Sequence, residues 1–415
     1  MKTILRFILL FLLSFSIVQA YSPADAQTDE ACEVLPLSAL YLPASSGRFV
    51  WETDHTLYDL NGEYTLYSEY AYNLSNFSIS PNGQYLTALR RFESDDDSLS
   101  EVVVFDQRGV LVYTGAPTTS YRSNVFWLSD EELLNYAMVF DYKYFDPGPY
   151  FGGLEFYYRT GIYRIFPFQR EYQFSLVPRN SPLQSDRTLI SNGLTSTFDG
   201  RYLFGHRGVF YDLLADKAPD SDAFAHFRFG QPSSTSYRLI GIEENTDSTG
   251  GGYSVYVYDL ENDTLTYVST INTFIDPFGQ PFSWSPDERY FLYAETGSHN
   301  GIESPRRIWL YDLHSGERVN TCLTQHLTID AREPSMPQVY RQDPEFVWSR
   351  DGRFVAMVSS VENDEPTRRY GVFIMDTQTH ALYQILALGA EYFMDFSVTP
   401  IAFASRYINL IGWME

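Results

Sequence analysis

Lysine is nearly absent from this chain once its first twenty residues are set aside. Lys143 and Lys217 are the only two that remain, and the formal net charge of the whole chain is -24. Nucleic acid and anionic lipid both need a basic protein face, so the composition argues against them as partners. A strongly acidic balance is typical of a surface that keeps an exported protein in solution.

Cysteine is also scarce, with Cys32 and Cys322 as its only two copies. An even number of cysteines in an exported chain permits one disulfide, and the segment after Cys32 is long enough to reach a neighbouring structural unit. The alternative is two unrelated thiols, one in a terminal extension and one on an outer strand. Neither is expected to act as a nucleophile, because no histidine is placed by sequence to activate it.

Long hydrophobic runs are missing except at the beginning of the chain. Residues 1–20 combine two basic residues, an apolar run from Ile8 to Val18 and a small-residue end at Ala20, which predicts a secretory signal peptide. A second candidate cut follows Ala26, and a retained anchor is the alternative. Cleavage would leave an extension over 21–32, no membrane span, and a net charge of -26 after loss of two positive charges from -24. We therefore expect export to the periplasm, the cell surface or the medium.

Catalytic and cofactor motifs are missing as well. The chain has no Gly-x-Ser-x-Gly elbow, no His-Glu-x-x-His pair, no cysteine pairs at metal spacing and no phosphate-binding glycine loop. Ser349-Arg-Asp-Gly352 differs from the sialidase Asp-box, because its glycine comes one position early. The sequence therefore predicts no catalytic residues, no cofactor and no metal, and it leaves enzyme activity open while favouring a protein without one.

Aromatic residues and one repeated phrase are what the chain has in plenty. Aromatic content is 17%, and an apolar strand end, a tight turn and a second apolar strand recur at 77–86, 282–291 and 346–355. Such a repeat is typical of the inner hairpin of one β-propeller blade. Third strands that close on an aspartate follow, and these end at Asp106, Asp212, Asp259, Asp312 and Asp376.

The spacing of the second strands predicts the number of blades. Their anchors fall near Phe49, Tyr85, Leu133, Tyr202, Leu239, Tyr290 and Phe354. We expect an all-β, seven-bladed propeller of four-stranded antiparallel blades over residues 33–415, as one domain and as a monomer. Eight blades would follow if Ile401 to Trp413 formed a blade of its own, closed by a strand near Val34. In either case the N- and C-terminal segments should pair, because a ring without such pairing leaves open edges.

The phrases Trp284-Ser-Pro-Asp-Glu-Arg-Tyr290 and Trp348-Ser-Arg-Asp-Gly-Arg-Phe354 resemble the WD40-like propeller repeats of the TolB type, also called PD40. The same repeat occurs in the propeller domains of prolyl oligopeptidases. This resemblance implies stacked four-stranded blades that serve as a protein or ligand platform, and it carries over no catalytic residues. The chain lacks the Gly-His and Trp-Asp pairs of true WD40 units, and no hydrolase-sized segment follows the propeller.

The repeated acidic residues have a structural interpretation. Each third-strand aspartate precedes a turn, where its side chain can accept backbone N–H groups two or three residues on. Asp199, Asp287 and Asp351 belong to the repeated turn itself, and Gly200 and Gly352 supply the positive φ that follows. These residues are expected to hold the fold together.

Loop insertions indicate where a ligand would bind. The long insertions fall between second and third strands and between blades, as over the predicted inter-blade connections 167–195 and 323–345, and both kinds of connection emerge on one face. One insertion is rich in aromatic residues, which suit carbohydrate or peptide surfaces, and another is acidic. The candidate binding residues are Tyr142, Tyr144, Tyr150, Tyr157, Tyr158, Asp95, Asp96 and Asp97. The alternatives are an extended hairpin that packs on its own blade and a solvated charged loop.

These observations favour an exported, non-enzymatic propeller that binds a protein, a peptide or a glycan through its long-loop face. The alternative is a hydrolase or lyase with a carboxylate site at the central channel, since propellers can bring carboxylates from several blades to one axis.

The predicted disulfide can be tested by thiol counting. We expect the oxidised chain to expose no reactive thiol after unfolding and to gain two on reduction. Changing Cys32→Ser, Cys322→Ser or both should lower the free energy of unfolding by the same amount, about 2–4 kcal/mol. Two reactive thiols in the unreduced, unfolded chain would contradict the pairing.

Overall fold

The structure is a computed structural model, and it describes only part of the chain. The described residues are 33–53, 56–63, 74–91, 99–141, 157–176, 194–205, 210–212, 215, 229–244, 253–271, 282–295, 298–299, 302–303, 307–324, 327–330, 338–341, 346–361, 370–388 and 408–415. Residues Val34–Glu415 form one compact unit. Among the described residues, every element is a β-strand except two short 3-10 turns, η1 (Leu37–Ala39) and η2 (Ala44–Ser46).

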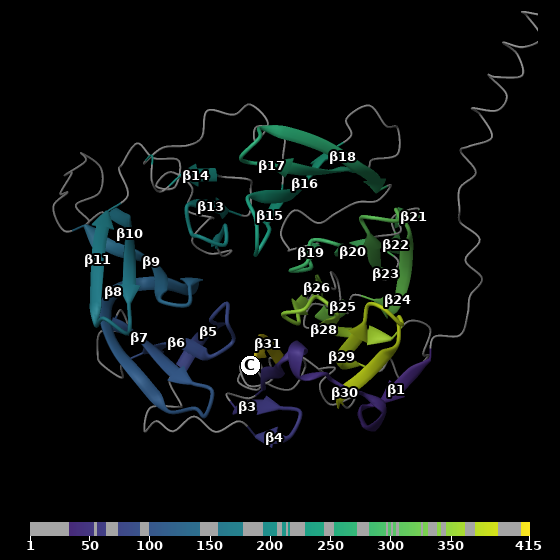
Figure 1. Ribbon diagram of the computed structural model, residues 1–415, viewed down its shortest axis with the longest axis horizontal. Helices are drawn as coiled ribbons and strands as arrows, with labels where there is room; N and C mark the ends of the chain where they lie inside the picture. The colour runs from purple at the N-terminus through teal and green to yellow at the C-terminus, as the bar shows by residue number, and fades with distance from the viewer. Residues whose placement is uncertain are drawn as a thin grey trace, which may run out of the picture. The chain divides into compact units, whose positions relative to one another are not determined.

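The described strands form seven blades that follow one another in chain order around a ring (Figure 1). Strand pairing continues from blade 2 into blade 3 and from blade 6 into blade 7, so each of these two pairs of blades forms one continuous sheet. We number each blade from its first, innermost strand outward. Blade 1 is β31 (Ile408–Met414), β2 (Arg48–Thr53), β3 (Thr56–Asp59) and β4 (Gly62–Glu63). Blade 2 is β5 (Leu74–Ile79), β6 (Tyr85–Arg91), β7 (Leu99–Asp106) and the first half of β8 (Leu111–Ser129). Blade 3 is the second half of β8, β9 (Glu132–Asp141), β10 (Tyr157–Phe166) and β11 (Glu171–Leu176).

The remaining blades follow the same plan. Blade 4 shows β12 (Leu194–Ser196), β13 (Tyr202–Gly205) and β14 (Phe210–Asp212). Blade 5 is β15 (Phe229–Pro232), β16 (Arg238–Glu244), β17 (Tyr253–Asp259) and β18 (Thr264–Ile271). Blade 6 is β19 (Phe282–Trp284), β20 (Tyr290–Glu295), β23 (Arg307–Asp312) and β24 (Arg318–Thr324). Blade 7 is β27 (Phe346–Trp348), β28 (Phe354–Val361), β29 (Tyr370–Asp376) and β30 (Leu382–Leu388).

Two small hairpins lie in the connections of blade 6 and between blades 6 and 7. β21 (Ser298–His299) pairs with β22 (Ile302–Glu303) between the second and third strands of blade 6. β25 (Leu327–Asp330) pairs with β26 (Gln338–Arg341) between blades 6 and 7. The all-β propeller with seven blades predicted from the second-strand anchors is therefore confirmed for the described part of the chain.

The hydrophobic core lies between the blades. Along β28, Phe354 and Ala356 pack against Phe49 and Trp413 of blade 1, whereas the intervening Val355 and Met357 pack against strands of blade 6. Successive strand residues point to opposite faces, so a sheet covered on both faces must be apolar at nearly every position. This burial explains why the second strands are nearly continuous apolar runs.

Ring closure is made by the two ends of the chain. β2 pairs antiparallel with β31 from Arg48↔Met414 to Thr53↔Ile408, so the last strand becomes the innermost strand of the first blade. Trp413 is 3% exposed, its ring centroid lies 5.3 Å from that of Phe49, and its Nε1 donates to the carbonyl oxygen of Val347 at 3.1 Å. Pairing of the terminal segments was predicted and is confirmed.

The eight-blade alternative is wrong for the described residues, because the strand near Trp413 joins blade 1. The strand near Val34 does not close an eighth blade. This strand, β1 (Val34–Pro36), lies parallel to β30 and adds an outer strand to blade 7, with Val34↔Leu382 and Pro36↔Gln384 in register.

Cys322 lies in β24 with φ 64° and takes part in a disulfide. Cys32 is the other cysteine of the chain and lies outside the described residues. The pairing of the two therefore stays a prediction.

No helix among the described residues has both the length and the apolar character needed to cross a membrane.

The closing strand generates a stability prediction. Trp413→Ala should lower the free energy of unfolding by about 3–5 kcal/mol, because it removes a buried aromatic side chain from the contact between blades 7 and 1. Val112→Ala is the matched control, since Val112 is 40% exposed on β8, and its effect should stay within about 0.5 kcal/mol. Urea unfolding measures the free energy of unfolding of both variants. Equal effects of the two substitutions would contradict a large contribution of the closing strand to stability.

Candidate functional site

A four-residue turn joins the first and second strands of most blades. In blade 7 the hydroxyl of Ser349 donates to Asp351 Oδ1 at 2.7 Å and accepts the backbone N–H of Phe354 at 2.8 Å. Gly352 closes the turn with φ +69°. The same arrangement recurs at Ser80/Asn82, Thr197/Asp199 and Ser285/Asp287. The turn chemistry predicted for these aspartates is confirmed.

An arginine directly before the second strand pairs with the aspartate that ends the third strand. Three blades repeat this ion pair, at Arg201–Asp212, Arg289–Asp312 and Arg353–Asp376, with N···O distances of 3.0, 2.8 and 2.8 Å. In blade 1 the equivalent pair is Arg48–Asp59, at 3.5 Å, with its arginine at the start of β2. Burial alone would raise the pKa of Asp376, but hydrogen bonds from Arg353 and from the backbone N–H of Gln378 outweigh it and hold this pKa below its ordinary value.

Carboxylates of the same turns also join neighbouring blades. Asp351 Oδ2 accepts the hydroxyls of Ser45 at 3.1 Å and Ser46 at 2.8 Å, which links blade 7 to the segment that enters blade 1. Between blades 2 and 3, Asp130 Oδ1 accepts the backbone N–H of Asn82 at 2.7 Å. The turn face of the ring therefore carries polar bonds from blade to blade.

The first turn of blade 5 is held by an acidic residue from blade 6. Its first turn runs Ser233-Ser-Thr-Ser-Tyr237 and contains no carboxylate. Glu288 of blade 6 accepts the hydroxyls of Ser233 and Ser236, and Arg238 Nη1 donates to Glu288 Oε2 at 2.7 Å. Burial would raise the pKa of Glu288, but these hydroxyls and Arg238 outweigh it and lower the pKa.

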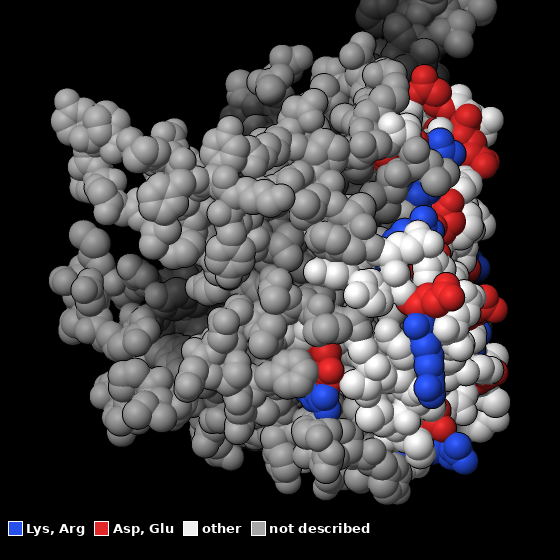
Figure 2. Space-filling view, turned by 90° about the vertical axis from the view of Figure 1, so that its left-hand side faces the viewer, with Lys and Arg blue, Asp and Glu red and all other residues white. Residues whose placement is uncertain are grey.

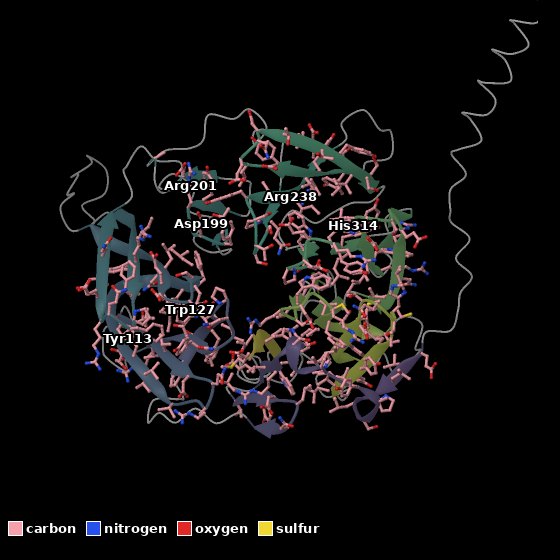
Figure 3. All side chains as sticks on the ribbon, in the orientation of Figure 1. Tyr113, Trp127, Asp199, Arg201, Arg238 and His314 are labelled. Atoms are coloured by element: carbon pink, nitrogen blue, oxygen red, sulfur yellow. The ribbon has the colours of Figure 1, made fainter. Side chains whose placement is uncertain are left out.

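Blade 4 contributes the second carboxylate to blade 5. The hydroxyl of Tyr237 donates to Asp199 Oδ2, and this bond raises the pKa of Tyr237 to about 12. Phe198 is 38% exposed and its ring centroid lies 5.0 Å from that of Tyr237. Asp199, Arg201 and Arg238 lie on these adjacent blades in Figure 3.

The shifted groups of this surface keep one charge state near neutral pH. Burial opposes ionisation of Asp199, Asp312 and Asp351, yet hydrogen bonds lower the pKa of each below its ordinary value. The arginines are ion-paired, and the pKa of Tyr237 is raised. General acid–base catalysis needs a group that titrates near the working pH, and the shifts of these groups all lead away from neutral pH.

Two carboxylates and an arginine do meet in blade 4, at Asp199, Arg201 and Asp212. Equivalent sets in blades 6 and 7 use the same turn and strand positions, so this convergence belongs to the repeat.

Within the described ranges, no group of three or more His, Cys, Asp or Glu side chains is arranged to hold a metal ion. Acidic and basic residues are also interspersed on the described surface seen in Figure 2.

Most of the candidate binding residues lie outside the described residues. Tyr142, Tyr144, Tyr150 and Asp95–Asp97 are outside the described residues. Tyr157 and Tyr158 begin β10, where their backbones pair with Asp141 and Phe140 of β9. This register extends the β9–β10 hairpin toward the aromatic insertion, and the binding role of all eight residues stays a prediction.

One predicted inter-blade connection is wrong in part. Residues 167–195 include the fourth strand of blade 3, because β11 (Glu171–Leu176) pairs with β10 after a turn over Phe166–Arg170. Glu171 and Tyr172 sit on this outer strand and are exposed, with Tyr172 at 54%. The polar Glu-Tyr-Gln start of the segment concealed it from a search for apolar strands.

The partners of the inter-blade bonds could not be identified from the sequence. Ser45, Ser46 and Tyr237 lie far along the chain from the carboxylates they bind, and none belongs to the repeated phrase. The hydroxyl run Ser233–Ser236 is the one local signal, since serine and threonine in a turn can supply donors to a carboxylate.

Comparison with known proteins gives similarity in fold only. No protein-family model matches the chain, and no curated protein sequence matches it significantly. Among solved structures, the β-propeller domain of Myceliophteria thermophila Cps50 (Swd1) is similar at 10% identity and a TM-score of 0.42, over 77% of this chain and 95% of that one. A putative 6-phosphogluconolactonase from Bacteroides fragilis is similar at 12% identity and a TM-score of 0.45, over 84% of this chain and 97% of that one. Oligogalacturonate lyase from Vibrio parahaemolyticus is similar at 10% identity and a TM-score of 0.43, over 81% of this chain and 92% of that one.

The inter-blade carboxylates predict acid-labile stability. Their folded-state pKa values are depressed, so their contribution is present above the unfolded-state pKa, near 4, and is lost as pH falls through the folded-state values. Glu288→Gln should cost about 1–3 kcal/mol at pH 7, because charge-assisted hydrogen bonds are lost. The difference from the wild-type chain should shrink toward pH 3.

Exposed Glu171 provides the control. Urea unfolding at a series of pH values should show Glu171→Gln matching the wild-type chain throughout. A Glu288→Gln penalty that grew as the pH fell would show that the sign of the effect is wrong.

Proposed function

We propose that this chain is an exported, non-enzymatic β-propeller built from WD40-like repeats of the TolB type. It acts as a binding or scaffold module for a protein, a peptide or a glycan, and it presents its ligand site on the long-loop face. In this proposal it functions as a monomer, without a cofactor and without nucleic acid as a partner. Swd1 and the two enzymes with similar propellers show no more than the fold that the chain shares with them.

The difference between the two sets of connections carries this proposal. On the turn face, first and second strands are joined by short turns whose polar groups bond to one another, as at Ser349–Gly352. The connections between second and third strands differ in length from blade to blade, as with 92–98, 142–156 and 245–252. Variation in length on one side of a constant frame is typical of ligand-binding loops.

The charge states of the turn face support a scaffold rather than a catalyst on that side. Asp351 and Glu288 are engaged by hydroxyls and by neighbouring blades, and Asp376 by Arg353. Groups that are committed to internal bonds hold the frame rigid and are not available to a substrate. A ligand is therefore expected at the opposite face.

The aromatic insertion is the part of that face with the clearest ligand chemistry. Tyr142, Tyr144 and Tyr150 combine flat apolar rings with hydroxyl tips, which suit the C–H faces of sugars and extended peptides. The acidic insertion with Asp95–Asp97 would add a preference for ligands with a basic or hydroxyl-rich part. Neutral glycans and basic peptides are the ligand classes that fit both insertions.

A combined glycan and peptide array tests this function. Wild-type protein should bind at least one class, and the triple variant Tyr142→Ser, Tyr144→Ser, Tyr150→Ser should bind it about tenfold or more weakly, because aromatic anchors dominate binding energy. The control is the double variant Tyr41→Ser, Tyr172→Ser, which removes exposed tyrosines at 78% and 54% exposure elsewhere on the molecule.

Three outcomes would overturn the proposal. The wild-type protein could fail to bind any array member, the control could lose binding as strongly as the triple variant, or the bound ligand could be cleaved. Cleavage is followed by mass spectrometry of the eluted ligand, and a new reducing end, an unsaturated sugar or a cut peptide would establish a hydrolase or lyase instead.

A further inference from the structure

The outer strands of the blades differ in how their edges are protected. An edge strand exposes unpaired N–H and C=O groups, and proteins usually protect it with charge, proline, β-bulges or a covering segment. Among the described outer strands, β4, β11, β14 and β24 carry a charged residue, and the outer part of β8 carries Gly115 and Pro117. Within the described set, β18 and β30 contain no charged residue, no proline and no glycine, and the β-bulge of β18 at Val268 lies beyond Thr264–Tyr267.

The edge of β30 is covered by the chain itself. β1 lies along it in parallel register, with Leu35 opposite Tyr383. Leu382 is buried, and its neighbours Tyr383 to Leu386 are partly buried. Three paired residues from an extended segment are therefore enough to cover an uncharged outer edge in this molecule.

The edge of β18 has no such cover among the described strands. β18 ends the sheet of blade 5 and lies on the outer side of that blade in Figure 1, where β15 lies nearest the centre of the ring. Thr264 to Tyr267 are all exposed, with Leu265 at 47% and Tyr267 at 56%. The register shifts between Val255 and Tyr256, so Thr264–Tyr267 is the regular part of the edge.

We propose that the outer edge of β18 is a docking site for an extended segment of a partner protein, which pairs with Thr264–Tyr267 as an added strand. This site lies on the outer rim of blade 5 and is independent of the ligand site proposed for the loop face. Added strands of this kind gain affinity from backbone hydrogen bonds and specificity from alternate side chains.

The exposed side chains define the chemistry of that segment. Leu265 and Tyr267 point to one face of the strand, and Thr264 and Thr266 point to the other, because strand residues alternate. Tyr267 also contacts Tyr256 of β17 edge-to-face, at 5.7 Å between centroids, which continues the aromatic surface inward. The partner segment should therefore place apolar or aromatic residues at every second position and small β-branched residues between them.

Acidic residues at one end of the edge predict the charge of the partner segment. The turn that leads into β18 contains exposed Glu261 and Asp263, close to Thr264. The whole chain is also strongly acidic, at -24. A second copy of this chain would bring like charges together, whereas a segment with a lysine or arginine beside Glu261 gains attraction. We therefore assign the edge to a basic-ended partner segment.

The test uses two labelled ten-residue peptides of alternating threonine and valine, one with two lysines at its N-terminus and one with them at its C-terminus. Fluorescence anisotropy should show one of them binding, with binding weakened by salt. Its analogue with N-methyl groups on alternate residues should bind about tenfold or more weakly, because the added backbone hydrogen bonds cannot form. Hydrogen exchange of the β18 amides should slow on binding.

A matched pair of protein variants locates the site. Leu265→Ser with Tyr267→Ser should weaken binding by about tenfold or more, whereas Val112→Ser with Tyr172→Ser, at exposed sites on β8 and β11, should leave it within about twofold. Failure of both lysine peptides to bind, equal binding of the N-methylated peptide, or equal loss in the two variants would overturn the proposal. Self-association of the chain that depends on Leu265 and Tyr267 would also overturn it, in favour of a second copy.

Discussion

A sheet that is apolar on both faces must be covered on both faces, and this constraint governs the whole molecule. β28 shows it directly, because alternate residues of that strand pack against blade 1 and against blade 6. No single blade can satisfy the requirement alone, and a row of blades would leave two of them with an open apolar face. Closing the row into a ring removes both open faces, and the β2–β31 pairing is the step that closes it. The burial of Trp413 between blades 7 and 1 places a large apolar side chain at that junction.

The turn face meets a second requirement, because the strand ends there carry polar groups that the apolar contacts between blades cannot satisfy. The repeated turn satisfies its own N–H groups with a serine or threonine hydroxyl and an aspartate, as at Ser349 and Asp351. The second oxygen of that aspartate is then free to bond to the neighbouring blade, as with Ser45 and Ser46. One residue therefore stabilises both a turn and a junction between blades, which gives a structural reason for a carboxylate at this position.

The fold could be predicted from the sequence to the extent that it depends on local pattern. Second strands such as Tyr85–Arg91 and Phe354–Val361 are short apolar runs behind a Pro, Asp or Gly turn, and their positions followed from that signal. Contacts across long sequence separations could not be predicted. The parallel addition of β1 to β30 and the bond between Tyr237 and Asp199 depend on which segments the ring brings together. The candidate site could be predicted only as a face and a set of insertions, because loop residues carry no periodicity that fixes their position.

Blade 5 shows how a weak copy of the repeat can still be held in the ring. Its first turn lacks the aspartate of the other blades, and Thr235 occupies the position two residues after Ser233. The turn instead bonds to Glu288 of blade 6 and to Asp199 of blade 4, so both neighbours supply the charge that it lacks. The weak repeat in this part of the sequence therefore corresponds to a turn that depends on its neighbours for carboxylates. Blade 5 is positioned through its inner turn and its two faces, and the outer strand β18 has no part in these described bonds between blades. Its exposed, uncharged stretch Thr264–Tyr267 therefore lies outside the network that holds the ring together.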